Sequence, residues 1–172
     1  MTAGGTAVRT DRDPGRAREV RWTTVADPLA GPVLDDLRDR YVALYGDGAH
    51  AEMSRWAATE FTAPDGGFLL LVEDGAAVAA GAFRRRDART AEVKRMWTRS
   101  DRRRRGLARR VLTELEDEAR RRGYTDVYLT TGSSQQDAAG LYVAAGYAPH
   151  FPSELLVAPP DTFRELPFTK RL

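Results

Sequence analysis

The sequence contains no cysteine and only two histidines among its 172 residues. Without cysteine the chain can form no disulfide, no thiolate metal site and no cysteine nucleophile. The two histidines, His50 and His150, stand too far apart for the paired spacing of a local metal-ligand motif. We therefore expect neither thiol chemistry nor a bound metal.

Long apolar runs are missing as well. No stretch approaches the roughly 18 apolar residues that span a bilayer, and residues 1–18 lack the apolar segment of a secretory signal. We therefore expect a cytoplasmic protein with no membrane partner. The 27 basic residues are set against 25 acidic ones, which leaves a formal net charge of +2. Any strongly basic surface must then be confined to one part of the molecule.

The length is that of one ordinary domain, and a hydrophobic fraction of 42% suffices for a continuous core. Residues 1–18 mix charges of both signs with Pro14 and Gly15, so we expect a flexible N-terminal tail. Residues 19–172 are then expected to fold as a single domain, with a first strand over residues 19–25.

Two helices are expected in the first third of the chain. Apolar residues recur at helical spacing from Leu29 to Leu44, with Asp27 as a candidate cap and Gly46 as the stop. A second, shorter helix is expected over residues 49–61, because a helical pattern there precedes breaking residues.

The middle of the chain predicts strands. Residues 68–73 and 76–84 are apolar and flank Asp74 and Gly75, which form a strong two-residue hairpin signal. Residues 90–98 then alternate in the manner of a strand. Strict alternation would place Glu92, Lys94 and Met96 on one face of that strand, with Val93, Arg95 and Trp97 on the other.

The second half of the chain predicts alternating helices and strands. Residues 107–122 carry a single apolar stripe closed by Gly123, and a short buried strand follows at residues 127–129. A further helix carries apolar residues between 138 and 145 and ends at Gly146. A strand, a crossover helix and a strand imply a parallel pair. We expect an α/β (α+β) fold with a mixed central sheet of about six or seven strands and helices on both faces.

Arginines cluster where the helix over residues 107–122 would begin. Arg102–Arg105 precede Gly106, and Arg109 and Arg110 lie in the first turns. Helix N-termini carry partial positive charge, so each arginine there is disfavoured by about 0.3–1 kcal/mol unless an anion is bound. Gly106 and Ala108 would let phosphate oxygens approach the amides of the first turn. By charge alone, a solvated arginine-rich turn explains the run equally well.

The segment Arg103–Ala108 resembles the acyl-CoA pyrophosphate motif Gln/Arg-x-x-Gly-x-Gly/Ala of the GNAT N-acetyltransferases, members of the acyl-CoA N-acyltransferase superfamily. The preceding segment 91–98 and the later segment 138–147 stand in the family's order and approximate spacing. Three linked motifs are much more specific than one hexapeptide. The resemblance is strong over residues 68–147 and implies the GNAT fold, with acetyl-CoA as cosubstrate.

The resemblance also implies a mechanism, in which a primary amine attacks acetyl-CoA directly through a tetrahedral intermediate. Two parallel strands would splay around the pantetheine arm, and a bulge near Met96 and Trp97 would offer amides to the thioester carbonyl. Tyr142 occupies the family's position for the general acid, although periodicity alone would make it a core residue. Glu92 is the leading candidate for the base, with a water chain as the alternative.

Other residues are given weaker roles. Glu60 and Glu73 are substitute bases, and Gln135 stands where many family members have an asparagine. Tyr41, Tyr45 and Trp56 are candidate acceptor-binding residues, and so are His50, His150 and Phe151, although each can equally serve packing. The residues expected to contact the cofactor are Met96, Trp97, Thr98, Arg103, Arg104, Arg105, Gly106, Leu107, Ala108, Arg109, Gln135 and Ala138.

Two other classes of function remain open. A nucleic-acid-binding module could use residues 102–110 against phosphates, but the near-zero net charge and the absence of interleaved aromatic residues disfavour it. A catalytically silent acyl-CoA sensor is also consistent, because binding and catalytic residues are separable. The sequence does not identify the acceptor, a small-molecule or peptide amine, nor the oligomeric state, with a homodimer among the alternatives.

Overall fold

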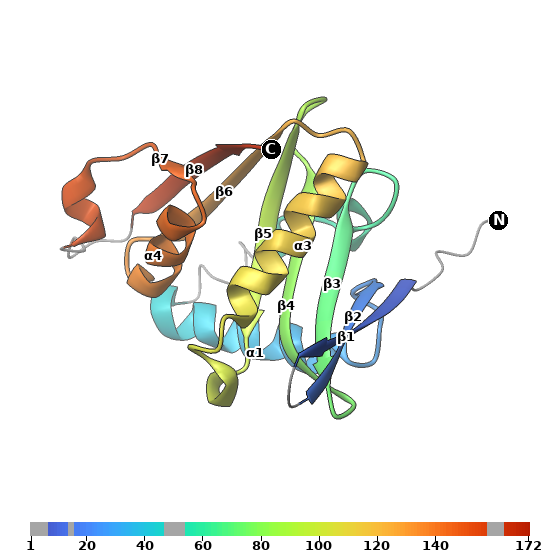
Figure 1. Ribbon diagram of the computed structural model, residues 1–172. Helices are drawn as coiled ribbons and strands as arrows, with labels where there is room; N and C mark the ends of the chain where they lie inside the picture. The colour runs from blue at the N-terminus through green and yellow to red at the C-terminus, as the bar shows by residue number, and fades with distance from the viewer. Residues whose placement is uncertain (1–6, 14–15, 47–53, 158–163) are drawn as a thin grey trace.

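The computed structural model describes residues 7–13, 16–46, 54–157 and 164–172 (Figure 1). The strands are β1 (Ala7–Asp13), β2 (Arg16–Thr23), β3 (Gly67–Glu73), β4 (Ala76–Arg85), β5 (Thr90–Thr98), β6 (Asp126–Gly132), β7 (Ala148–Pro149) and β8 (Glu165–Arg171). The helices are α1 (Ala30–Tyr45), α3 (Leu107–Arg121) and α4 (Gln136–Ala144), with short 3₁₀ turns η1 (Ala58–Phe61), η2 (Ser100–Arg102) and η3 (Ser153–Leu156).

Within the described residues, the eight strands form one sheet in the order β1-β2-β3-β4-β5-β6-β8-β7. All neighbouring pairs are antiparallel except β5 and β6, which are parallel. The expected mixed α/β sheet is thus confirmed, with slightly more strands than the six or seven expected. No helix in the described ranges has the length and apolarity needed to cross a membrane.

Helices cover both faces of the sheet, as expected. On one face α3 and α4 pack against a core cluster that includes Val111, Leu115 and Tyr142. On the other face α1 and η1 pack against a second cluster that includes Leu37 and Phe61. Each large apolar side chain buried in this way stabilises the fold by about 1.5–3 kcal/mol.

We expected a flexible tail over residues 1–18, but its described parts, residues 7–13 and 16–18, form strands. Residues 1–6 and 14–15 lie outside the described residues. β1 pairs antiparallel with β2 from Ala7↔Trp22 to Asp13↔Arg16. The expected boundary at residue 19 therefore falls inside β2. Edge strands often carry charged side chains, so the polar composition of this segment concealed a strand.

The first helical region agrees in part with expectation. α1 ends before Gly46, which has a φ of +69°, but it begins at Ala30 rather than directly after Asp27. The Asp27 carboxylate instead accepts hydrogen bonds from the Leu29 amide and the Thr23 hydroxyl in the turn before the helix. Of the helix expected over residues 49–61, residues 49–53 lie outside the described residues. In the described remainder Ser54 is helical, residues 55–57 are not, and a 3₁₀ turn covers Ala58–Phe61.

The β3–β4 hairpin is confirmed, and so are β5, α3, β6 and α4. Asp74 and Gly75 both have positive φ, 52° and 76°, as a two-residue hairpin turn of the I′ type requires. β7 and β8 were not expected from the sequence. β8 lies between β6 and β7 and extends the sheet on the α4 side.

A β-bulge interrupts β5. Its register against β4 leaves Arg95 and Met96 together opposite Gly81, and Arg95 has a φ of +57°. A Cβ atom at Gly81 would lie 2.6 Å from Val111 Cγ1 and 2.8 Å from Leu115 Cδ1. Only glycine therefore lets α3 pack this closely on the sheet at the bulge.

The bulge makes the expected alternation of residues 90–98 wrong in its second half. Val93 packs in the cluster beneath α3, whereas Trp97 packs in the cluster beneath α1. One inserted residue reverses the side on which every later side chain falls. Trp97 thus shares a face with Glu92, and Met96 packs on the α3 side.

Candidate functional site

The parallel strands β5 and β6 separate toward their carboxyl ends. Their ladder runs only from Thr90↔Asp126 to Val93↔Leu129, although β5 continues to Thr98 and β6 to Gly132. Among the described residues, no other strand pairs with this edge of β5. The bulge lies within the unpaired stretch, so backbone groups at the end of β5 are available to a ligand.

The arginine run beside this opening divides into two parts. Arg103, Arg104 and Arg105 are exposed, and their side chains form no ion pair or hydrogen bond with the described residues. Gly106 has a φ of +72°, with nothing within 4 Å of a Cβ placed on it. The first turn of α3 contains no acidic residue and no side-chain cap. An unneutralised cationic turn with uncapped amides is a suitable site for a phosphate group.

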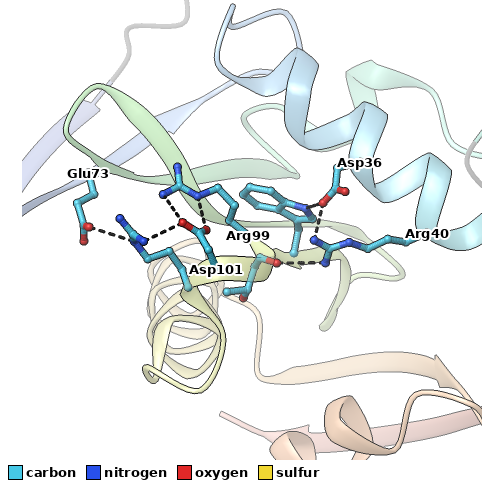
Figure 2. Close-up of polar contacts among 8 residues, drawn as sticks. Asp36, Arg40, Glu73, Arg99 and Asp101 are labelled. Atoms are coloured by element: carbon cyan, nitrogen blue, oxygen red, sulfur yellow. Dashed lines mark hydrogen bonds and ion pairs between the residues drawn. The ribbon is translucent and has the colours of Figure 1, made fainter.

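Arg102, by contrast, is bound to two carboxylates, Glu73 and Asp101, which Figure 2 labels. It donates to the buried Glu73 carboxylate at 3.3 Å and to Asp101 at 2.8 Å. Glu73 also accepts a hydrogen bond from Arg18 of β2 at 3.0 Å. A hydrogen bond from Arg99 lowers the pKa of Asp101. These ion pairs fix the connection between β5 and α3 and engage both carboxylate oxygens of Glu73, whose role as a substitute base stays a prediction.

A second set of contacts attaches α1 to the end of β5 (Figure 2). The indole Nε1 of Trp97 donates to Asp36 of α1, which also pairs with Arg40 one turn further along the helix. Arg40 donates to the backbone carbonyl of Thr98 at 3.1 Å. The strand end that borders the opening is therefore held by α1 as well as by the sheet.

Tyrosines from α1 and α4 come together on the other side of the opening. Tyr142 is buried, and its ring packs against Phe168 at 5.6 Å. Burial raises the pKa of Tyr142, and the nearby Tyr41 phenol raises it further, so the hydroxyl is protonated at neutral pH. Gln135 Nε2 donates to the Tyr45 hydroxyl at 2.7 Å, and the Tyr41 and Tyr45 rings lie 5.5 Å apart.

Glu92 lies on the α1 face of the sheet in a cluster of charges. Its buried carboxylate is 2.6 Å from Arg84 Nη2 and 3.2 Å from Lys94 Nζ. Arg84 also pairs with Glu60 at 3.0 Å, and its guanidinium lies 3.5 Å from the centroid of the Trp56 ring. The structure thus brings Glu92, Glu60 and Trp56 together on the α1 face, where Tyr41 packs against the same core cluster as Trp56.

The remaining expected cofactor residues line the start of α3 and α4. Leu107 is buried, Ala108 is half-buried, and Ala138 packs against the core cluster beneath α3 and α4. Arg109 donates to the carbonyl of Ala144 at 2.8 Å, so it joins α3 to α4.

Of the remaining acceptor candidates, His50 lies outside the described residues. His150 is exposed, and its Nε2 lies 2.7 Å from the Thr169 hydroxyl. Phe151 packs on Phe168 with 5.0 Å between ring centroids. Both residues therefore belong to the β7–β8 side, away from Trp56.

Sequence reasoning missed the ion pairs that shape the site. The spacing of Asp36 and Arg40, four residues apart on a helix, was the one readable signal among them. Nothing in the sequence links Glu73 to Arg102, or Arg84 to Trp56, because these contacts arise from sheet register and from the path of the chain after β5.

Comparisons with known proteins point to one family. A sequence model described as "Acetyltransferase (GNAT) family" matches residues 32–147. YsnE of Bacillus subtilis (strain 168), an uncharacterized N-acetyltransferase, is 39% identical over 69 residues, which are 39% of this chain and 46% of YsnE. The match thus spans about half the length of that curated relative.

Solved structures show the same fold. The GNAT domain of S. lividans PAT has a TM-score of 0.67 at 20% identity and covers 97% of each chain. A GNAT family acetyltransferase from Elizabethkingia anophelis, solved with acetyl-CoA bound, has a TM-score of 0.61 at 15% identity. That match covers 90% of this chain and 98% of the Elizabethkingia chain.

Proposed function

The chain belongs to the acetyltransferase (GNAT) family, and on that basis we propose that it transfers an acetyl group from acetyl-CoA to a primary amine. The family and the fold support acyl-CoA N-acyltransferase activity. The observation that carries the proposal is the opening between β5 and β6. It has on one side Arg103–Arg105, which have no side-chain partner among the described residues, and on the other a buried, protonated tyrosine.

This geometry supports our assignment of the cofactor residues. The pyrophosphate would be bound by Arg103–Arg105 and by the amides of the first turn of α3 beyond Gly106. The pantetheine arm would lie along the open edge of β5 at Met96–Thr98, with Gln135 and Ala138 of the α4 side opposite. Arg103–Arg105 have no side-chain partner in the described part of the chain, and this supports the assignment, because an arginine cluster beside a helix N-terminus is otherwise unfavourable.

The chemical step is acyl transfer. The amine nitrogen attacks the thioester carbonyl carbon, the carbon–sulfur bond breaks, and coenzyme A leaves as a thiol. Backbone amides beside the bulge would stabilise the oxyanion, an effect worth about 3 kcal/mol per donor. Tyr142 would give its phenolic proton to the leaving thiolate, and the raised pKa of Tyr142 keeps that proton in place until it is needed.

The attacking amine must first lose a proton, because an alkylamine with a pKa of about 10.4 is mostly protonated at neutral pH. We assign the base to Glu92, with a water chain as the alternative. Glu92 lies on the same strand as the bulge, and its Oε2 accepts no hydrogen bond from the described residues. Tyr41 and Tyr45 are assigned to the acceptor side, because both lie near the α4 residues that border the opening.

Thermal unfolding of the purified protein with excess acetyl-CoA, and with ATP as a polyanion control, tests the binding step. A ligand at about 100 times its dissociation constant adds about 2.7 kcal/mol of stability. Stabilisation by acetyl-CoA alone is expected, followed by thiol release in a screen of primary amines. An equal shift with ATP would reduce the arginine turn to a general anion site. Binding without turnover of any amine would favour the acyl-CoA sensor.

A further inference from the structure

Three buried polar atoms have no hydrogen-bond partner among the described residues, and all three lie in one cluster. They are Trp56 Nε1, Arg84 Nε and Glu92 Oε2. Buried polar groups are nearly always paired in native proteins, and each unpaired group lowers the free energy of unfolding. Their concentration at one place indicates a site whose partners come from outside the described residues.

The other polar atoms of this cluster are paired. Arg84 Nη1 donates to Glu60 at 3.0 Å, and Lys94 Nζ lies 3.2 Å from Glu92 Oε1. Arg84 Nη2 lies 2.6 Å from Glu92 Oε2 as an ion pair, but the two groups are not aligned for a hydrogen bond. The Arg84 guanidinium is held over the Trp56 ring at 3.5 Å. The unpaired atoms are thus fixed in place by neighbours that leave their hydrogen-bonding positions unused.

The position of the cluster fits an acceptor site. Arg84 of β4 is directly opposite Glu92 of β5, three residues before the bulge. Val93 faces α3, so Glu92 faces the side of the sheet that carries α1. An acceptor bound there would reach the end of β5 from the face opposite α3, while the arginine turn takes the cofactor from the other side.

We propose that Trp56, Arg84 and Glu92 form the acceptor subsite, and that it selects a primary amine that also carries a carboxylate, in the manner of an amino acid. This inference rests on the acyl transfer proposed above. Trp56 Nε1 and Arg84 Nε are two donors that match the oxygens of a carboxylate. Glu92 Oε2 is an acceptor that matches an ammonium group. A simple alkylamine would satisfy Glu92 alone and leave both donors unpaired.

Matched acceptor pairs test the selection. We would measure initial rates of thiol release with amino acids and with their decarboxylated amines, such as L-lysine against cadaverine, with L-lysine amide as the uncharged member. The kcat/KM is expected to be about tenfold or more higher for the carboxylate-bearing member, because one hydrogen bond to a charged group is worth at least that factor. Equal values for the pair, or an amide as good as the acid, would overturn the proposal.

Thermal shifts with the same compounds give a readout that does not need turnover. L-lysine should raise the Tm of the acetyl-CoA complex more than cadaverine at the same concentration. A selective shift without turnover would retain the subsite and reject acyl transfer to that amine. The absence of a shift and of turnover with every carboxylate-bearing amine would reject the subsite, while a shift with acetyl-CoA alone would keep the cofactor assignment intact.

Trp56→Phe separates recognition from folding, because it removes Nε1 and keeps an aromatic ring beneath Arg84. The KM for the carboxylate-bearing amine should rise about tenfold, more than the KM for its decarboxylated partner. The Tm of the protein without ligand should stay the same or rise, because an unpaired buried donor has been removed. The matched control is Trp22→Phe on β2, which should leave the acceptor preference unchanged. A lower Tm with equal losses for both amines would indicate a purely structural Trp56 and overturn the proposal.

Discussion

Replacing Glu73 by glutamine should loosen the arginine turn without altering any residue in it. The Glu73 carboxylate is 4% exposed and pairs with Arg18 at 3.0 Å and with Arg102 at 3.3 Å. Glutamine keeps the size of the side chain, but its neutral amide removes the negative charge that the part-buried Arg18 and Arg102 guanidinium groups share at this position. The connection between β5 and α3 then loses its anchor to β3.

The magnitude follows from the burial of the three groups. Removing one partner of a fully buried ion pair costs about 3–5 kcal/mol. Here the Arg18 and Arg102 side chains are 24% and 18% exposed, and in the Glu73→Gln protein Arg102 would still pair with Asp101. We therefore expect a loss of about 1–3 kcal/mol, which corresponds to a fall in Tm of about 2–12 °C for a chain of this length.

The cofactor should also bind more weakly, because a mobile turn must be ordered before it holds the pyrophosphate. We expect the Kd for acetyl-CoA, measured by titration calorimetry, to rise about three- to tenfold while kcat at saturation changes little. The control is Glu19→Gln, which breaks the pair with Arg21 at 26% exposure of both side chains and should cost less than about 1 kcal/mol. A Glu73→Gln protein that is less stable but binds acetyl-CoA normally would refute the link between this anchor and the turn.

The remaining predictions concern the turn, the acid and the bulge. Arg103→Glu should raise the Kd for acetyl-CoA at least about tenfold by calorimetry. It should not lower the Tm, because Arg103 is exposed and has no partner within the described chain. The control is Arg120→Glu at the far end of α3, which should not change the Kd. Tyr142→Phe should lower kcat about 10²-fold or more in the thiol-release assay with little change in KM. The pKa of Tyr142 is raised, so the general acid keeps its proton as the pH increases. In the unsubstituted protein, kcat/KM should therefore increase with pH toward the pKa of the amine, with no decrease below about pH 10. Gly81→Ala should lower the free energy of unfolding by about 1–3 kcal/mol in urea, because its Cβ would overlap Val111.

The elements that the sequence predicted well are those with a local signal. Asp74 and Gly75 specify their turn by backbone conformation, and residues 107–122 specify a helix by one apolar stripe. The bulge in β5 has no comparable signal, because an inserted residue changes the face of Trp97 without changing the composition around it. β1 was missed for a different reason, since an edge strand needs no regular apolar face.

The candidate site shows the same division. The motif at Arg103–Ala108 located the turn, but only the structure separates Arg102, whose partner Glu73 lies far upstream, from the three arginines that follow it. All four residues are arginines with the same charge, so the sequence does not distinguish them. The difference arises from the long-range contact between Arg102 and Glu73. The roles of Tyr142 and Glu92 remain predictions that the kinetic experiments address.

Helix α1 is joined to both sides of the opening, and this has a mechanical consequence. Asp36 and Arg40 attach it to the end of β5, and Tyr45 attaches it to Gln135 at the start of α4. Arg40 and Tyr45 are separated by roughly 7.5 Å of helix, at 1.5 Å per residue. The helix therefore acts as a rigid spacer that sets the width of the opening. Deleting one residue between them would turn the Tyr45 side by about 100° and break the span, whereas most substitutions there would preserve it.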